Sequence, residues 1–164
     1  RPVARGRARV KGAPPASPRS FALRALLDVN VLIALFDSDH IDHARARLWF
    51  GAEVHHGWAS CALTENGFVR VVSQPRYPSP VPTALAIARL ARATQSEHHE
   101  FWPCELSLLD DQVFDRSRIH GPRQVADAYL LALAVAHGGR LVTFDQTIAL
   151  DAVVGASASN LVVL

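Results

Sequence analysis

The ten residues from Asp127 to Ala136 constrain the fold most strongly, because they join one carboxylate to an otherwise apolar helical pattern. A helix that is nonpolar on nearly every face is expected to be buried. A carboxylate in its first turn is costly to bury unless a cation or hydrogen bonds satisfy the charge. The helix N-terminus supplies part of that compensation, and a metal ion would supply more. Other carboxylates in comparable positions would therefore indicate a shared metal site.

Two such acids stand where buried strands are expected to end. The apolar run of residues 22–27 is typical of a strand buried on both faces, and Asp28 follows it, ahead of a helical pattern over residues 29–36. Asp145 follows a second apolar run, residues 141–144. Ligand sites in open α/β sheets lie at the carboxyl ends of strands, so both aspartates are candidates for a functional site.

Two further candidates come from helices. Glu65 lies in the first turn of a helix expected over residues 62–72, and Asp127 in the first turn of one expected over residues 123–137. The alternation of strands and helices favours an α/β three-layer sandwich with a central, mainly parallel sheet. The other helices are expected over residues 39–50, 82–93 and 110–116, and the other strands over residues 57–60, 101–102 and 161–164.

This architecture brings the four acids to one place. Right-handed crossovers put strand ends and helix starts on the same edge of a parallel sheet, so the acids are expected to converge on one cleft. Carboxylates that lie so close cannot all ionise without a cation, and oxygen ligands select Mg²⁺ or Mn²⁺. Asn30 and Thr143, each two residues from an aspartate, can hold a carboxylate or a water molecule. The predicted catalytic and metal-binding residues are Asp28, Glu65, Asp127 and Asp145.

Each of these residues also has a purely structural interpretation. A single acid at a helix start is as often an N-cap or a partner of the helix dipole, but this explanation is much weaker for four acids in matching positions. His98 and His99 are interpreted as part of a solvated loop, because neighbours on an extended segment point to opposite faces.

Charge divides the chain into two parts. Residues 1–20 hold six of the 17 basic residues and no acid, and their composition predicts a disordered basic tail that either touches RNA or lies outside the working protein, the second being favoured. The remaining 11 basic residues face all 15 acids, so the folded part, residues 21–164, is mildly acidic. If the protein binds RNA, local arginines would then have to hold the phosphates. The candidates are Arg70, Arg76 and Arg123.

Composition also bears on location and excludes several enzyme classes. No stretch is long and apolar enough for a membrane span, and Cys61 and Cys104 fit no metal spacing, so a reduced, cytoplasmic protein is expected. Phospho-acceptor and dehalogenase-like domains use a lysine, whereas the only lysine here is Lys11 in the tail. The chain has no P-loop, no dinucleotide-binding glycine pattern and no nucleophile elbow.

Four segments resemble the motifs of PIN-domain proteins, in particular the VapC-like toxin ribonucleases of prokaryotic toxin–antitoxin modules. Each motif is weak alone, but the four are specific together in this order and spacing, and the resemblance covers about residues 22–164. The segments are Leu26–Ile33, Thr64–Phe68, Asp127–Ala134 and Leu141–Asp145.

The resemblance implies a metal-dependent endoribonuclease that uses Mg²⁺ or Mn²⁺ to cleave RNA. It implies that Asp28, Glu65 and Asp127 are the core ligands, with Asp145 as the least strictly required fourth acid, and that Asn30 and Thr143 support them. A structured substrate such as tRNA or rRNA, a cognate antitoxin, a homodimer and no membrane association are expected. The alternative is a PIN-fold protein that binds RNA or protein without catalysis.

Overall fold

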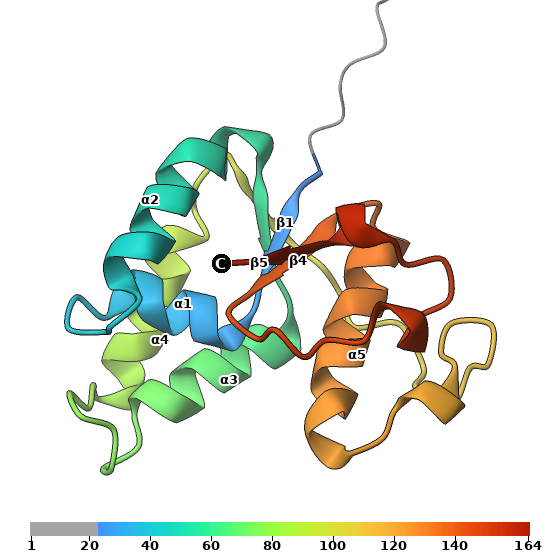
Figure 1. Ribbon diagram of the computed structural model, residues 1–164. Helices are drawn as coiled ribbons and strands as arrows, with labels where there is room; N and C mark the ends of the chain where they lie inside the picture. Colours follow the sequence, from blue (N-terminus) through green and yellow to red (C-terminus); the bar gives the residue numbers. More distant parts are fainter. Residues whose placement is uncertain (1–22) are drawn as a thin grey trace, which may run out of the picture.

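The sheet confirms the predicted α/β architecture. The computed structural model describes residues 23–164, so the expected disorder of residues 1–20 falls outside them (Figure 1). Its five strands are all parallel and lie in the order β3-β2-β1-β4-β5. The strands are β1 (Ala25–Leu27), β2 (Trp58–Ser60), β3 (His99–Phe101), β4 (Arg140–Thr143) and β5 (Leu161–Val163).

Helices cover both faces of the sheet and complete a three-layer sandwich (Figure 1). Four α-helices pack on one face, whereas α5 and the irregular segments around it pack on the other. The α-helices are α1 (Val29–Phe36), α2 (His43–Glu53), α3 (Ala62–Val72), α4 (Thr83–Ala93) and α5 (Pro122–Ala136). The short 3₁₀ helices are η1 (Val54–His56), η2 (Arg116–Arg118), η3 (Leu150–Ala152) and η4 (Ala158–Asn160).

The two hydrophobic cores follow from the alternation of side chains along the strands. In β1, Leu26 packs with Leu131 of α5, whereas its neighbour Leu27 packs with Leu32 and Phe68 on the opposite face. All five of these side chains are fully or almost fully buried. Since β1 is covered on both faces, its sequence is a continuous apolar run, which is why this strand could be predicted from sequence.

The buried helix α5 forms as its composition predicted, but its start differs. Pro122 occupies the first helical position, where its missing N–H costs nothing, and Gly138 ends the helix at φ 60°. Because the helix begins at residue 122, Asp127 lies in the second turn, and the prediction of a first-turn position was wrong. The helix dipole therefore compensates its charge less than we expected.

The helix predicted over residues 110–116 is absent. Asp110 accepts a hydrogen bond from the backbone N–H of Gln112 (2.9 Å), and Asp115 does the same for Ser117 (3.0 Å). Such local bonds compete with helical hydrogen bonding. The segment instead forms turns, an antiparallel bridge from Phe114 to Val153, and η2.

The order of the strands determines where a site can form. The chain adds β2 and β3 on one side of β1, and β4 and β5 on the other, so the strand order reverses next to β1. In open α/β sheets, ligands bind outside the carboxyl ends of the strands at this point of reversal. Asp28 directly follows β1, and Asp145 lies two residues after β4. Over residues 23–164 the helices are all too short or too polar to cross a bilayer.

Candidate active site

Asp28 is held rigidly between β1 and α1. It caps the N-terminus of α1, because its Oδ1 accepts a hydrogen bond from the backbone N–H of Val29 (2.6 Å). Its Oδ2 accepts a second hydrogen bond from the Thr143 hydroxyl (2.7 Å), and only 8% of the residue is exposed. The capping interpretation is therefore correct for Asp28, but burial of a carboxylate beside a second strand end exceeds what a cap requires.

Thr143 joins the ends of β1 and β4. Besides donating to Asp28, its Oγ1 accepts hydrogen bonds from the Asn30 side-chain amide (3.1 Å) and from the backbone N–H of Asp145 (3.0 Å). One donated and two accepted bonds use the full capacity of a hydroxyl group. The Asn30 carbonyl in turn accepts the backbone N–H of Phe144 (3.4 Å). Thr143 thus holds the Asp28 carboxylate directly, and Asn30 holds Thr143.

Three aspartates act on one another electrostatically. Burial raises the pKa of Asp28, and the negative charge of Asp145 raises it further. Burial, followed by the charges of Asp28 and Asp145, raises the pKa of Asp127 to about 6. The pKa of Asp145 is lowered instead, because the hydroxyl and the backbone N–H of Thr147 both donate to its Oδ1 (2.6 and 2.7 Å).

These acids fit a hard divalent cation by their chemistry. Their donors are all carboxylate oxygens, and burial, with a smaller contribution from neighbouring negative charge, raises the pKa values of Asp28 and Asp127. Even so, nowhere in residues 23–164 do three or more His, Cys, Asp or Glu side chains form a ready-made metal-ligand cluster. The aspartates therefore lie near one another without closing around a single point.

Glu65 is placed differently from the three aspartates. It lies in the first turn of α3, as predicted, and its Oε1 accepts a hydrogen bond from the fully buried Ser60 hydroxyl (2.6 Å). Ser60 shares a sheet face with Trp58, in the core under α1 to α4, whereas Thr143 shares the opposite face with Leu141. The role of Glu65 as a metal ligand stays a prediction.

His99 completes the cluster around Glu65. Its Nε2 lies 2.8 Å from the Ser60 hydroxyl, and its ring packs 4.3 Å from that of Trp58. His99 belongs to β3, so our interpretation of this histidine as part of a solvated loop was wrong. Parallel pairing of β2 with β3 sets His99 beside Trp58, and that pairing could not be anticipated from local sequence.

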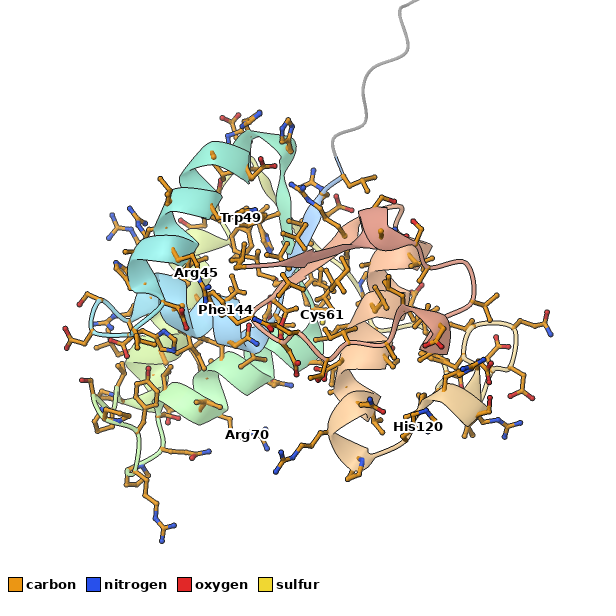
Figure 2. All side chains as sticks on the ribbon, viewed as in Figure 1. Arg45, Trp49, Cys61, Arg70, His120 and Phe144 are labelled. Carbon is orange, nitrogen blue, oxygen red and sulfur yellow. The ribbon has the colours of Figure 1, made fainter. Side chains whose placement is uncertain are left out.

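The three arginines predicted to contact RNA are all exposed. Arg123 lies one helical turn before Asp127 on α5, so the two residues share a helix face. Arg70 lies in the last turn of α3, and Arg76 in the loop that follows. Figure 2 shows Arg70 and His120 extending from opposite sides of the end of the molecule where α5 begins.

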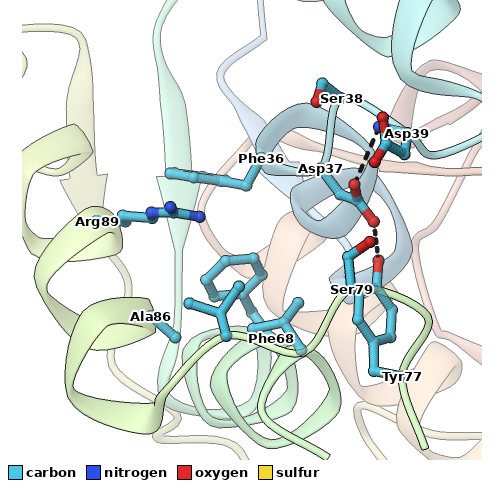
Figure 3. A pocket seen from close by; sticks show the side chains of 11 residues that line it. Phe36, Asp37, Ser38, Asp39, Phe68, Tyr77, Ser79, Ala86 and Arg89 are labelled. Carbon is cyan, nitrogen blue, oxygen red and sulfur yellow. Dashed lines mark hydrogen bonds between the residues drawn. The ribbon is translucent and has the colours of Figure 1, made fainter.

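A separate cavity of about 260 Å³ lies between the end of α1, α3 and α4 (Figure 3). Its floor contains Phe36 and Phe68, with ring centroids 5.0 Å apart, and Arg89 extends across it. At its rim the Tyr77 hydroxyl donates to Asp37, and burial together with this bond raises the pKa of Tyr77 to about 12. None of the four predicted acids lines this cavity.

Comparison with known proteins agrees with this architecture. The PIN domain family model matches residues 25–153. Ribonuclease VapC44 of Mycobacterium tuberculosis is 66% identical over 142 residues, which cover 87% of this chain and 100% of the relative. Ribonucleases VapC39 and VapC38 of the same organism are 44% and 49% identical, covering 81% and 74% of this chain and 96% and 84% of the relatives. The chain therefore belongs to the PIN domain family, in the group of the VapC ribonucleases, as its motifs predicted.

Proposed function

We propose that this protein is a metal-dependent endoribonuclease that acts as the toxin of a toxin–antitoxin pair. The observation that carries the proposal is the convergence of Asp28, Asp127 and Asp145 where the strand order of a PIN-domain sheet reverses. The relatives named as VapC ribonucleases support the same activity. The proposed ligands are these three aspartates, with Glu65, whose Oε1 is bonded to Ser60, as a fourth acid.

Each residue of the site would have a separate role in phosphodiester hydrolysis. A bound Mg²⁺ or Mn²⁺ supplies positive charge beside the scissile phosphate and makes a water molecule a stronger acid. Asp28 is oriented through both carboxylate oxygens, and Asp145 is fixed through Oδ1, which leaves Oδ2 unbonded by Thr147. Asp127 contributes the third carboxylate from α5, and its pKa of about 6 applies to the metal-free protein, in which burial and the charges of Asp28 and Asp145 act on it.

The substrate and partners follow from the same proposal. RNA is the proposed substrate, in a structured form such as tRNA or rRNA that exposes single-stranded bases. Arg70, Arg76 and Arg123 would hold its phosphates, since the folded part of the chain is acidic. A cognate antitoxin, homodimerisation and a cytoplasmic location complete the proposal.

The test compares purified parent protein with the Asp28→Asn variant on bulk tRNA and rRNA, with Mg²⁺, with Mn²⁺ and with a chelator. We expect cleavage by the parent in either metal and none with the chelator. The Asp28→Asn variant should cleave at least about 100-fold more slowly, because it removes a charge beside the reacting phosphate. Asp39→Asn, an exposed acid in the turn after α1, serves as the matched control and should cleave at the parental rate. Equal rates for Asp28→Asn and the parent would refute this site.

One observation favours the alternative function, an RNA- or protein-binding PIN domain without catalysis. The described acids do not form a closed ligand cluster. If the purified protein binds RNA but yields no new RNA ends with either metal, the binding function is the correct one.

A further inference from the structure

Arg118, which the sequence did not single out, lines a small hollow that Asp127 also lines. It ends η2, in the segment whose far end is marked by His120 in Figure 2. Together with Gln124, Asp127 and Ile148, it lines a hollow between α5 and the chain that follows β4. The hollow, about 10 Å³, barely holds one water molecule. Arg118 and Asp127, a carboxylate of the proposed site, therefore line the same hollow.

The Arg118 guanidinium forms only long ion pairs with its acidic neighbours. It forms loose ion pairs with Asp151 (3.3 Å) and Asp115 (3.9 Å), and about 55% of the side chain is exposed. Among residues 23–164 it makes no side-chain hydrogen bond by the usual geometry. Arg116, two residues earlier, donates to Asp111 at 2.7 Å instead. Arg118 therefore keeps donors that can bind a phosphate.

A basic group beside the aspartates would offset their repulsion of an RNA phosphate. RNA must approach three aspartates that already repel one another, and the folded part of the chain is acidic overall. An arginine can bind two phosphate oxygens through parallel N–H groups, which gives both charge and orientation. Asp115, whose Oδ1 is fixed by the Ser117 N–H and hydroxyl (3.0 and 2.6 Å), limits how far Arg118 can swing away.

We propose that Arg118 binds a backbone phosphate of the RNA substrate and so positions the strand over the aspartates. This inference rests on the proposed ribonuclease function and adds a substrate contact to it. The proposed occupant is an RNA phosphate, because the hollow is too small for a side chain or a nucleobase and about 55% of the Arg118 side chain is exposed.

The test measures RNA binding rather than cleavage. All proteins carry Asp28→Asn and are kept metal-free with a chelator, and the anisotropy of a labelled tRNA is followed at several salt concentrations. Arg118→Gln should weaken binding roughly 10-fold, the size of one hydrogen bond to a charged group. It should also reduce the slope of log affinity against log salt by about 0.7 to 0.9, since one phosphate contact is lost. Arg118→Lys should keep the slope and recover part of the affinity.

Arg116→Gln is the matched control, because it removes the same charge two residues away from an arginine already bonded to Asp111. Its affinity and salt slope should stay within twofold of the parent's. Equal effects of Arg116→Gln and Arg118→Gln, or no effect of Arg118→Gln, would overturn the inference, as would a parent without RNA affinity. A parent that binds tRNA through Arg118 yet never cleaves it would refute the proposed activity and leave the Arg118 contact standing.

Discussion

The carboxyl end of the sheet has two neighbouring regions, and in each an acid bonds to a hydroxyl. We call them the aspartate edge, at the ends of β1 and β4, and the Glu65 edge, at the ends of β2 and β3. The acids of the two regions have different surroundings. At the end of β1 and β4, Thr143 bonds Asp28 while Asp145 adds an unfavourable charge, so burial and repulsion raise the pKa of Asp28. At the end of β2 and β3, Ser60 bonds Glu65, and His99 lies on the other side of the same hydroxyl. The aspartate edge therefore brings several negative charges together, whereas at the Glu65 edge the acid, the hydroxyl and the histidine form hydrogen-bonding contacts with one another.

The difference between the two regions indicates where a ligand is expected to bind. Uncompensated like charges lower stability, so they persist at sites where a ligand provides the missing compensation. Asp28 also bonds to a buried hydroxyl, but the charge of Asp145 acts on it in addition. The comparison therefore favours the aspartate edge for the proposed cation site, and the following variants test whether Glu65 belongs to the same site.

The largest effect is expected for Asp127→Asn. Cleavage should fall about 100- to 1,000-fold, because a charged group beside the reacting centre is lost. The metal-free variant should nevertheless be more stable than the parent at pH 7, by about 1 kcal/mol after allowance for solvent screening. Urea unfolding monitored by circular dichroism, beside a cleavage assay, measures both quantities.

The pH dependence of that stability has a definite sign. The pKa of Asp127 is about 6 in the folded protein and near 3.8 when unfolded, so the folded state binds more protons between these values. The free energy of unfolding of the metal-free parent should therefore fall as pH rises from about 4 to about 6, and the fall should be smaller in Asp127→Asn. An identical pH profile for both proteins would show that folding does not raise the pKa of Asp127.

Thr143→Val should have the next largest effect. It removes the donor to Asp28 and the acceptor used by Asn30 and Asp145 in a fully buried position. The expected cost is about 2 kcal/mol of stability and roughly 10- to 100-fold in cleavage or Mn²⁺ affinity. Thr143→Ser keeps the hydroxyl and should retain most of both; calorimetric titration with Mn²⁺ provides the readout.

Ser60→Ala makes the matching change at the other edge. It should cost about 1 kcal/mol of stability, because a buried hydrogen bond is lost, but should slow cleavage less than Thr143→Val does. If the two variants lose cleavage equally, the edges form one site and Glu65 is a working ligand. Kinetics at saturating Mn²⁺, with thermal unfolding as the check on folding, distinguish these outcomes.

The smallest effect is expected for Thr147→Val. The hydroxyl donor to Asp145 Oδ1 disappears, but the backbone N–H of residue 147 remains, so cleavage should fall no more than about fivefold. Because hydrogen bonding to Thr147 holds the pKa of Asp145 low, that pKa should rise in the variant. Carboxyl NMR shifts followed through a pH titration measure it, and Thr147→Ser should restore the parental value.

Sequence patterns predicted the regular elements well where burial is simple. The helices over residues 29–36 and 62–72 match α1 and α3 to the residue, because their apolar periodicity coincides with the core they face. Prediction failed at residues 110–116, where aspartate and serine side chains bond the local backbone instead. Gly67 belonged to a recognised motif, but only the structure shows the reason, since a Cβ there would meet a Val29 methyl group at 2.5 Å.

The sequence by itself determined the alternating architecture, the buried helix α5, and the family to which the chain belongs, because these depend on periodicity and on motifs that are local in the chain. It also identified the acids, since a charge within an apolar run is visible without coordinates. Only the tertiary structure decided which acids meet. Thr143 and Asp28 are 115 residues apart, and the pairing of β1 with β4 joins them, whereas the pairing of β2 with β3 holds Ser60 and Glu65 beside His99. Strand order and sheet face depend on the packing of the whole chain, and no local pattern encodes them.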